Sequence, residues 1–114
     1  MPRLPNWERA VIPPAKIRNY LLFPDHPRGR SKAIFFASLG YEVKAWTRLA
    51  SDLRTQCLPM PASLSRTTEF GPKYVIYATL VGPNGTSAEV VTVWILRWGQ
   101  SAPCLVTAYP GGKR

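Results

Sequence analysis

The sequence predicts an α+β domain in which N-terminal helices pack on a three- to four-stranded antiparallel sheet. Up to residue 57, apolar residues recur at spacings of three and four, which is typical of helices. From residue 73, runs rich in β-branched and aromatic residues are separated by turn signals, which is typical of strands. Helices that precede the strands favour an antiparallel meander with the helices on one face. The 114 residues suffice for one domain.

The first two elements are defined by proline. Residues 1–14 contain four prolines and should run as an extended arm. Residues 15–22 should form a short helix, because Pro14 suits a first turn and Pro24 ends the segment. The buried face of this helix would consist of Ile17, Tyr20 and Leu21.

Two further helices are expected. The second should begin with Ser31 as its N-cap and end at Gly40, a residue that readily adopts the left-handed conformation past a helix. Its inward stripe would consist of Ala33, Phe36 and Ala37. The third, residues 42–57, is amphipathic. Its apolar side would hold Val43, Trp46, Leu49, Ala50 and Leu53, and its polar side mainly Lys44, Arg48, Asp52 and Arg54.

Strands fill the second half of the chain. Residues 59–70 predict a crossing loop or an irregular edge strand, and residues 73–81 a regular strand. Turn signals separate it from strands over residues 87–98 and 104–110. The single domain is therefore divided into an arm (1–14), a helical part (15–57), a sheet (64–110) and a tail (111–114).

The charge balance points to an anionic partner. Lys and Arg number 15 against 6 Asp and Glu, giving a formal charge of +9 and a pI near 10.2. Such a surplus on a small body attracts nucleic acid or an acidic protein, beyond what solubility requires. We expect no metal and no cofactor, since one histidine and two cysteines cannot supply the four ligands of a structural zinc site.

Cysteine usage and hydropathy favour the cytoplasm. Cys57 and Cys104 allow one disulfide, but two reduced thiols in a cytosolic chain is the interpretation we favour. The N-terminus lacks the apolar stretch of a signal peptide, and no run approaches the 18 apolar residues of a membrane span. We therefore expect a cytoplasmic protein without a membrane partner.

Three cations precede the second helix, where a helix dipole disfavours positive charge. They are Arg28, Arg30 and Lys32, within the stretch LLFPDHPRGRSKAIFF. A bound phosphate would remove the conflict, with Arg30 binding in fork geometry and Lys32 acting as a point charge. Alternatively, these side chains extend into water or pair with nearby carboxylates.

His26, the only histidine, lies beside these cations. Histidine is the side chain that titrates near neutral pH, and the neighbouring cations should favour its neutral, basic form. RNA cleavage needs a base for the 2′-hydroxyl, an acid for the 5′-oxygen and a cation for the phosphorane, without a metal. The alternative is a turn residue whose ring caps a carbonyl.

The sheet offers hydroxyls and aromatic rings. Strand alternation groups Thr92 with Trp94 and Thr107 with Tyr109. If neighbouring strands are in register, these hydroxyls share one face as a polar patch within an aromatic surface that could stack on bases. Lys73 could point into the same cleft. The alternative is a sheet core with satisfied hydroxyls.

Two end motifs carry a resemblance to a known family. YLLFPDHPRGRSKAIFFASLGY resembles the pattern YLLNPxHPxGxxKAxxFxxxLGY, and VVTVWILRWGQSAPCLVTAYP resembles a closing VxTxW…LxTxY pattern. The intervening GPKYVIYATLVGPNG also fits, so the likeness spans Leu4 to Pro110. The family is a small bacterial toxin-like domain. It occurs at the C-termini of polymorphic and phage-head-associated toxins, and as a stand-alone protein beside a small partner.

The resemblance implies an RNase-toxin-like endoribonuclease, similar to the superfamily that contains barnase, EndoU, colicin-type and RelE-type nucleases. Its recurring positions would be His26, Gly29, Lys32, Lys73, Thr92, Trp94, Thr107 and Tyr109, with Tyr41 as aromatic core. Because the chain begins shortly before the first motif, we expect a stand-alone intracellular toxin or an isolated domain. A small acidic antitoxin or immunity protein would be its partner.

The leading hypothesis is therefore the toxin of a toxin–antitoxin system. It would be a metal-independent endoribonuclease that cleaves tRNA or mRNA to 2′,3′-cyclic phosphate and 5′-hydroxyl ends. The catalytic residues would be His26, Lys32, Thr92, Thr107 and Tyr109, and the substrate-binding residues Arg28, Arg30, Lys73 and Trp94. Two alternatives stay open: a non-catalytic basic module that binds nucleic acid or protein, and a nucleotidyl- or ADP-ribosyl-transferase toxin.

Overall fold

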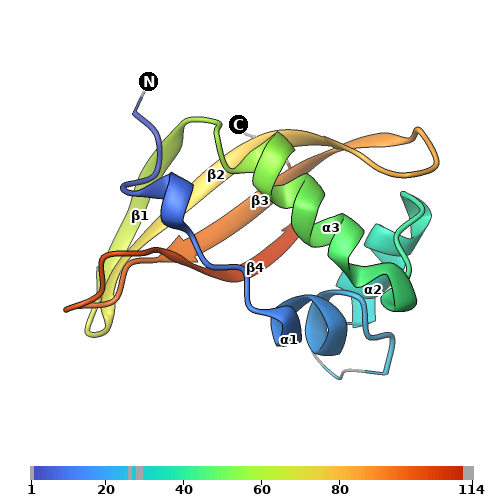
Figure 1. The fold of residues 1–114 in the computed structure, drawn as a ribbon, viewed down its shortest axis with the longest axis horizontal. Coiled ribbons are helices and arrows are strands. Elements are labelled where there is room, and N and C mark those ends of the chain that lie inside the picture. Colours follow the sequence, from blue (N-terminus) through green and yellow to red (C-terminus); the bar gives the residue numbers. More distant parts are fainter. Residues whose placement is uncertain (1, 26, 28–29, 112–114) are drawn as a thin grey trace.

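Helices and a sheet form two layers (Figure 1). The computed structural model describes residues 2–25, 27 and 30–111. Four strands, paired antiparallel in the order β1-β2-β3-β4, build one sheet. They are β1 (Ala62–Thr68), β2 (Gly71–Val81), β3 (Ser87–Ile95) and β4 (Cys104–Pro110). The predicted α+β class and the antiparallel meander are confirmed, and residues 62–68 form the edge strand.

The helices are short and several continue into tighter or wider turns. The first is α1 (Pro14–Lys16), extended by a π-helical turn, Ile17–Leu21. The second is α2 (Arg30–Ser38). A 3₁₀ turn, Val43–Ala45, leads into α3 (Trp46–Asp52), which continues as a π-helical turn, Leu53–Cys57. In the part of the chain that the structure describes, no helix is both long and apolar enough to cross a membrane.

The core lies between α3 and one face of the sheet, as α3 crosses that face in Figure 1. Its large, fully buried side chains include Leu49 and Leu53 from the helical side, Phe36 from α2, and Ile76, Leu80, Trp94 and Leu105 from the sheet. Ile17 and Leu21 are buried as predicted. Val43 and Ala37, which were expected to point inward, are exposed, because each lies near the end of its helix.

The C-terminus of α2 is closed by the predicted glycine. Gly40 has a φ of 99°, and its N–H donates to the carbonyl of Ala37 at 3.0 Å. The N–H of Tyr41 donates to the carbonyl of Phe36 at 3.2 Å, and the two rings meet edge to face with centroids 6.2 Å apart. These bonds and this contact form a Schellman motif. The start was predicted two residues late: an N-cap at Ser31 implies a helix from Lys32, whereas α2 begins at Arg30 and Ser31 lies inside the helix.

The β2–β3 hairpin is docked onto this helix end. Asn84 Nδ2 donates to the carbonyl of Ser38 at 3.1 Å. At Gly82, a Cβ atom would lie 2.1 Å from the carbonyl oxygen of Leu39, so only glycine allows this approach. The hairpin therefore fixes α2 against the sheet.

The N-terminal arm touches both edges of the sheet. Arg3 forms an antiparallel bridge with Pro61, next to β1, and Val11 forms a parallel bridge with Cys104 of β4. The N–H of Val11 donates to the carbonyl of Pro103 at 2.8 Å, and the N–H of Leu105 donates to the carbonyl of Val11 at 3.0 Å. The arm is extended at these bridges, with a 3₁₀ turn between them.

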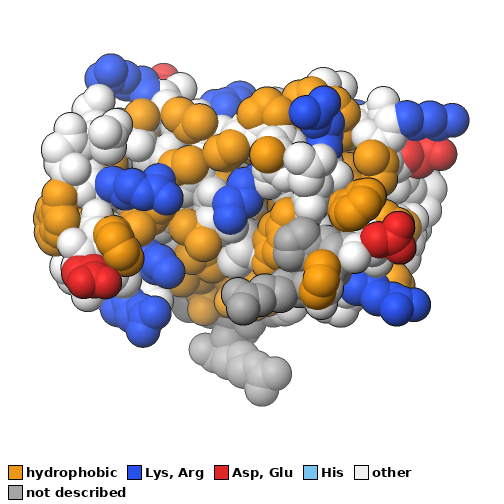
Figure 2. Space-filling view, turned by 90° about the horizontal axis from the view of Figure 1, so that it is seen from below, with side chains coloured by type: hydrophobic (Ala, Val, Ile, Leu, Met, Phe, Trp, Pro, Cys, Tyr) orange, Lys and Arg blue, Asp and Glu red, His pale blue; other side chains and the backbone are white. Residues whose placement is uncertain are grey.

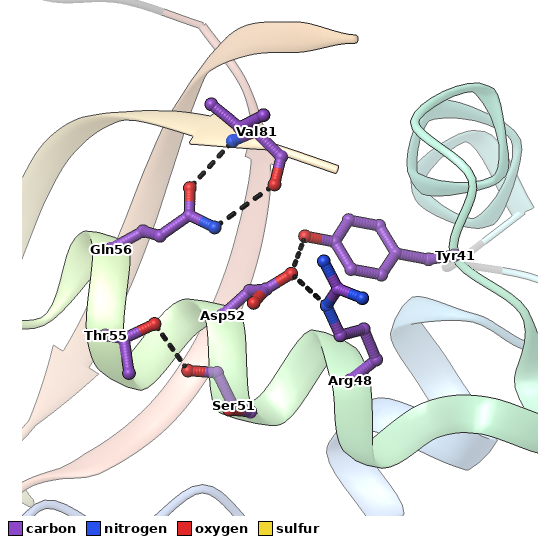
Figure 3. A network of polar contacts seen from close by, with 7 residues as sticks. All are labelled: Tyr41, Arg48, Ser51, Asp52, Thr55, Gln56 and Val81. Carbon is purple, nitrogen blue, oxygen red and sulfur yellow. Dashed lines mark hydrogen bonds and ion pairs between the residues drawn. The ribbon is translucent and has the colours of Figure 1, made fainter. Parts of the chain in front are cut away.

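A buried carboxylate joins α2 to α3 (Figure 3). Asp52 is only 7% exposed, although the sequence placed it on the polar side of its helix. Its Oδ2 accepts from the hydroxyl of Tyr41 at 2.7 Å and from Nε of Arg48 at 3.0 Å. Two partners explain why this acid is stable away from water.

Two neighbouring groups complete this region. The side-chain amide of Gln56 pairs with both the N–H and the carbonyl of Val81, at 2.7 and 3.1 Å, as a neighbouring strand would. Burial, assisted by the charge of Asp52, raises the pKa of the Cys57 thiol to about 12. Cys57 and Cys104 are both free thiols.

Candidate functional site

An open groove of about 1020 Å³ runs between α1, with its π-helical turn, and the edge strand β4. Its polar lining consists of Lys16, Asn19, Tyr20, Arg97 and Thr107. Figure 2 views the molecule from below, the side on which α1 lies in Figure 1, and shows Lys and Arg side chains interspersed with hydrophobic ones. Cations beside apolar surface suit a ligand with anionic groups and flat rings.

Tyr20 stands at the centre of the polar contacts of this groove. Its hydroxyl lies 3.3 Å from Oγ1 of Thr107. The Nζ atoms of Lys16 and Lys32 each lie 5.4 Å from the centroid of its ring, within the range of a cation–π contact. The three helical residues come from two elements: the α1 segment supplies Lys16 and Tyr20, one turn apart, and α2 supplies Lys32. The site therefore depends on how α2 is docked.

These surroundings shift the acidity of Tyr20. Burial alone acts to raise the pKa of its phenol. Hydrogen bonding to Thr107 and Lys32, together with the charges of Lys32 and Lys16, outweighs that effect and holds the pKa below its ordinary value. A tyrosine with a lowered pKa is a better proton carrier near neutral pH.

The structure brings together two residues that the sequence predicted separately. Lys32 and Thr107 are 75 positions apart, and both contact Tyr20. Tyr20 itself was expected only as part of a buried helix face. It is only partly buried, because the ring packs at the core margin while the hydroxyl reaches the groove. Its position four residues after Lys16 was the signal in the sequence that could have identified it.

Two predicted site residues lie in the core instead. Thr92 and Trp94 are fully buried, and Nε1 of Trp94 donates to Oγ1 of Thr92 at 2.9 Å. A β-bulge at Val106 explains the error: Trp94 pairs with Leu105, whereas Val93 pairs with Thr107. Thr107 therefore lies on the face opposite Thr92. The shared face predicted for Thr92, Thr107 and Tyr109 is wrong, and neither core residue can touch a substrate.

The other predicted residues are spread more widely. Tyr109 shares the face of Thr107 and is 38% exposed, but it lies outside the described lining of the groove. Arg30 is exposed at the start of α2, two residues from Lys32. Lys73 lines a different groove, at the β1–β2 hairpin, so the expectation of a shared cleft is wrong. His26, Arg28 and Gly29 lie outside the described residues.

The chain matches a family model described as Domain of unknown function (DUF6883) over residues 3–112. The chain belongs to the DUF6883 family. No curated protein and no solved structure matches it. Among the described residues of this DUF6883 chain, no three His, Cys, Asp or Glu side chains gather into a group that could hold a metal ion. The chemistry offered by its groove is that of cations, hydroxyls and a phenol.

Proposed function

We propose that the chain is a metal-independent endoribonuclease, acting as the toxin of a toxin–antitoxin pair on tRNA or mRNA. The observation that carries the proposal is Tyr20, whose ring centroid lies 5.4 Å from the ammonium nitrogens of both Lys16 and Lys32 and whose hydroxyl lies next to Thr107. Two cations and two hydroxyls around one point suit a phosphodiester that develops extra negative charge during reaction.

The reaction would follow the chemistry of 2′-hydroxyl attack. The 2′-oxygen forms a bond to phosphorus while the bond from phosphorus to the 5′-oxygen breaks, which leaves 2′,3′-cyclic phosphate and 5′-hydroxyl ends. Tyr20 accepts the 2′ proton, and its lowered pKa favours that role. Lys16 and Lys32 stabilise the phosphorane, and Thr107 orients the phenol. The leaving 5′-oxygen takes up a proton, and His26 or Tyr109 remains the predicted carrier of protons in this reaction.

Charge supports the proposed partners. The chain carries 15 Lys and Arg against 6 Asp and Glu, so both RNA and a small acidic antitoxin match its net charge of +9. An antitoxin that covers the groove would block access to Tyr20 and Lys32.

The test is cleavage of end-labelled RNA by purified protein in excess EDTA, with the product ends identified. The unaltered protein should cleave and leave cyclic phosphate ends. Tyr20→Phe keeps the ring and the cation–π contacts but removes the hydroxyl, so kcat should fall by roughly 10²–10⁴-fold. Lys32→Ala should lower kcat by about 10²–10³-fold, because it removes a positive charge from the site.

The matched control is Tyr77→Phe, at a tyrosine on β2 that is 37% exposed and outside the described lining of the groove. It should cleave like the unaltered protein. Intact RNA with a folded preparation, or full activity in Tyr20→Phe, would contradict the proposal. RNA binding without cleavage would favour the non-catalytic binding module.

A further inference from the structure

Trp98 is a large aromatic side chain that is both exposed and fixed. It is 62% exposed, yet its indole Nε1 donates to the carbonyl of Glu69 at 3.0 Å. Its backbone N–H donates to the carbonyl of Phe70, also at 3.0 Å. The polar atom of the ring is therefore satisfied within the protein, and what remains open to solvent is apolar ring surface. Such a ring has already lost its rotamer entropy and is ready to bind a flat partner.

The backbone around Trp98 is held closely by a glycine. Beyond the end of β3, the N–H of Leu96 donates to the carbonyl of Pro72 at 3.0 Å, so pairing with the start of β2 continues past the named strand. A Cβ atom at Gly71 would lie 2.2 Å from the carbonyl oxygen of Leu96 and 2.9 Å from Cα of Arg97. Glycine allows this approach, and Phe70, 63% exposed, is thereby held near Trp98.

Three cations lie near this aromatic end of the sheet in the sequence or in the strand pairing. Arg66 and Lys73 line a groove of about 450 Å³ at the β1–β2 hairpin, together with Phe70, two threonines and one acid, Glu69. Arg97, the residue before Trp98, lines the main groove that holds Tyr20. Aromatic rings with flanking cations are how proteins bind single-stranded nucleic acid, in which bases are free to stack and phosphates need neutralising.

We propose that Trp98 is a stacking platform for a base of single-stranded RNA. The base would belong to the part of the RNA that leaves the Tyr20 groove at Arg97. Phosphates of that strand would contact Arg66 and Lys73 in the second groove. The inference rests on the proposed function, since it takes RNA as the ligand of the Tyr20 groove. It adds a substrate class: single-stranded segments are bound, and duplexes, whose bases already stack on one another, are bound less well.

The experiment measures binding of a fluorescein-labelled 2′-O-methyl RNA oligonucleotide by anisotropy. This probe lacks the 2′-hydroxyl that cleavage requires, so binding is read without reaction. Trp98→Ala should raise the Kd of the single strand by roughly 5- to 100-fold. Trp98→Phe keeps an aromatic face and should recover most of the affinity. The same probe annealed to its complement should show little dependence on Trp98.

Two controls separate stacking from charge and from folding. Val81→Ala removes an exposed apolar side chain, 44% exposed, at the far end of β2 and should leave Kd unchanged. Lys73→Ala should lower the slope of log Kd against log salt by about 1, whereas Trp98→Ala should leave the slope unaltered. Thermal unfolding of Trp98→Ala should stay cooperative, with only the small loss of stability expected from removing the exposed hydrogen bond to Glu69.

The outcomes distinguish this inference from the proposed function. An unchanged Kd in Trp98→Ala would overturn the platform. The exposed ring would then be assigned to a contact with another protein. An equal loss for single strand and duplex would overturn it as well. Trp98-dependent binding of the probe without any RNA cleavage in EDTA would overturn the nuclease and leave the platform standing.

Discussion

Two tyrosines of this chain show how surroundings set the acidity of a single residue. Tyr20 lies among ammonium groups, and the pKa of its phenol is lowered. Tyr41 is buried and donates to the carboxylate of Asp52; burial first, and then that hydrogen bond and charge, raise the pKa of its phenol. Opposite shifts in one small domain separate a residue suited to proton transfer from one that stays protonated. From the sequence alone, the pKa values of Tyr20 and Tyr41 cannot be ranked.

The raised pKa of Tyr41 predicts a loss of stability in alkali. Above pH ~10 the unfolded chain releases the phenol proton while the folded chain keeps it, so the folded state binds more protons and stability falls as pH rises. The stabilisation is complete below the unfolded pKa and is lost toward the higher folded pKa. Urea unfolding at several pH values should give a slope in this range that is shallower in Tyr41→Phe, by up to about 1.4 kcal/mol per pH unit.

The stability of Tyr41→Phe at neutral pH gives a second test. Tyr41→Phe removes one of the two donors to Asp52 and should be destabilised by roughly 1–3 kcal/mol at pH 7. Tyr77→Phe, at an exposed tyrosine, should change stability little at either pH. An equal slope in Tyr41→Phe and the unaltered protein would contradict the protonation assigned to Tyr41.

At the level of elements, the sequence predicts strands well and the site only in part. Alternation placed β2 to within two residues, and Gly40 marked the end of α2. Alternation also assumes that every residue on one strand has one partner, so the extra residue at Val106 reversed the face of Thr107 relative to Thr92. Helical spacing identified the face of Tyr20, but it gives no information on how far a long side chain reaches.

The contact between the β2–β3 hairpin and α2 gives a prediction at this scale. Gly82→Ala would place a methyl group 2.1 Å from the carbonyl oxygen of Leu39, so the hairpin and the helix must separate. We expect a loss of about 2 kcal/mol or more in chemical unfolding. The proposed RNA cleavage should fall as well, because α2 carries Lys32.

Gly85→Ala is the matched change for that prediction. It meets no atom within 4 Å, but it occurs at a φ of 85°, so its expected loss is only about 1 kcal/mol. A smaller loss for Gly82→Ala than for Gly85→Ala would show that the close approach to Leu39 is not what holds the hairpin.

On the scale of the whole molecule, the net positive charge destabilises the folded state but favours the binding of anions. A formal charge of +9 on 114 residues creates self-repulsion in the folded state. The charge was readable from composition, whereas the grouping of cations around Tyr20 and near Trp98 needed the fold. Salt screens the repulsion within the protein, and it would also weaken the attraction to RNA that we propose.

Salt should therefore raise the melting temperature and weaken the proposed RNA binding over the same range. Going from about 10 to about 150 mM salt shortens the Debye length from ~30 to ~8 Å, so the repulsion is largely screened. Lys44→Glu, at an exposed position, lowers the net charge from +9 to +7 and should show a smaller gain. Calorimetry in the two buffers measures the effect, and a melting temperature that falls with salt would contradict it.

The N-terminal arm bridges Pro61 beside β1 and Cys104 in β4. Since a single short segment is bonded at both margins of the sheet, neither margin can fray without pulling on the other. Opening at the groove side is thus coupled to opening at the opposite margin, three strands away. Amide protons at the two margins should accordingly exchange in one cooperative event, at a common rate, instead of independently.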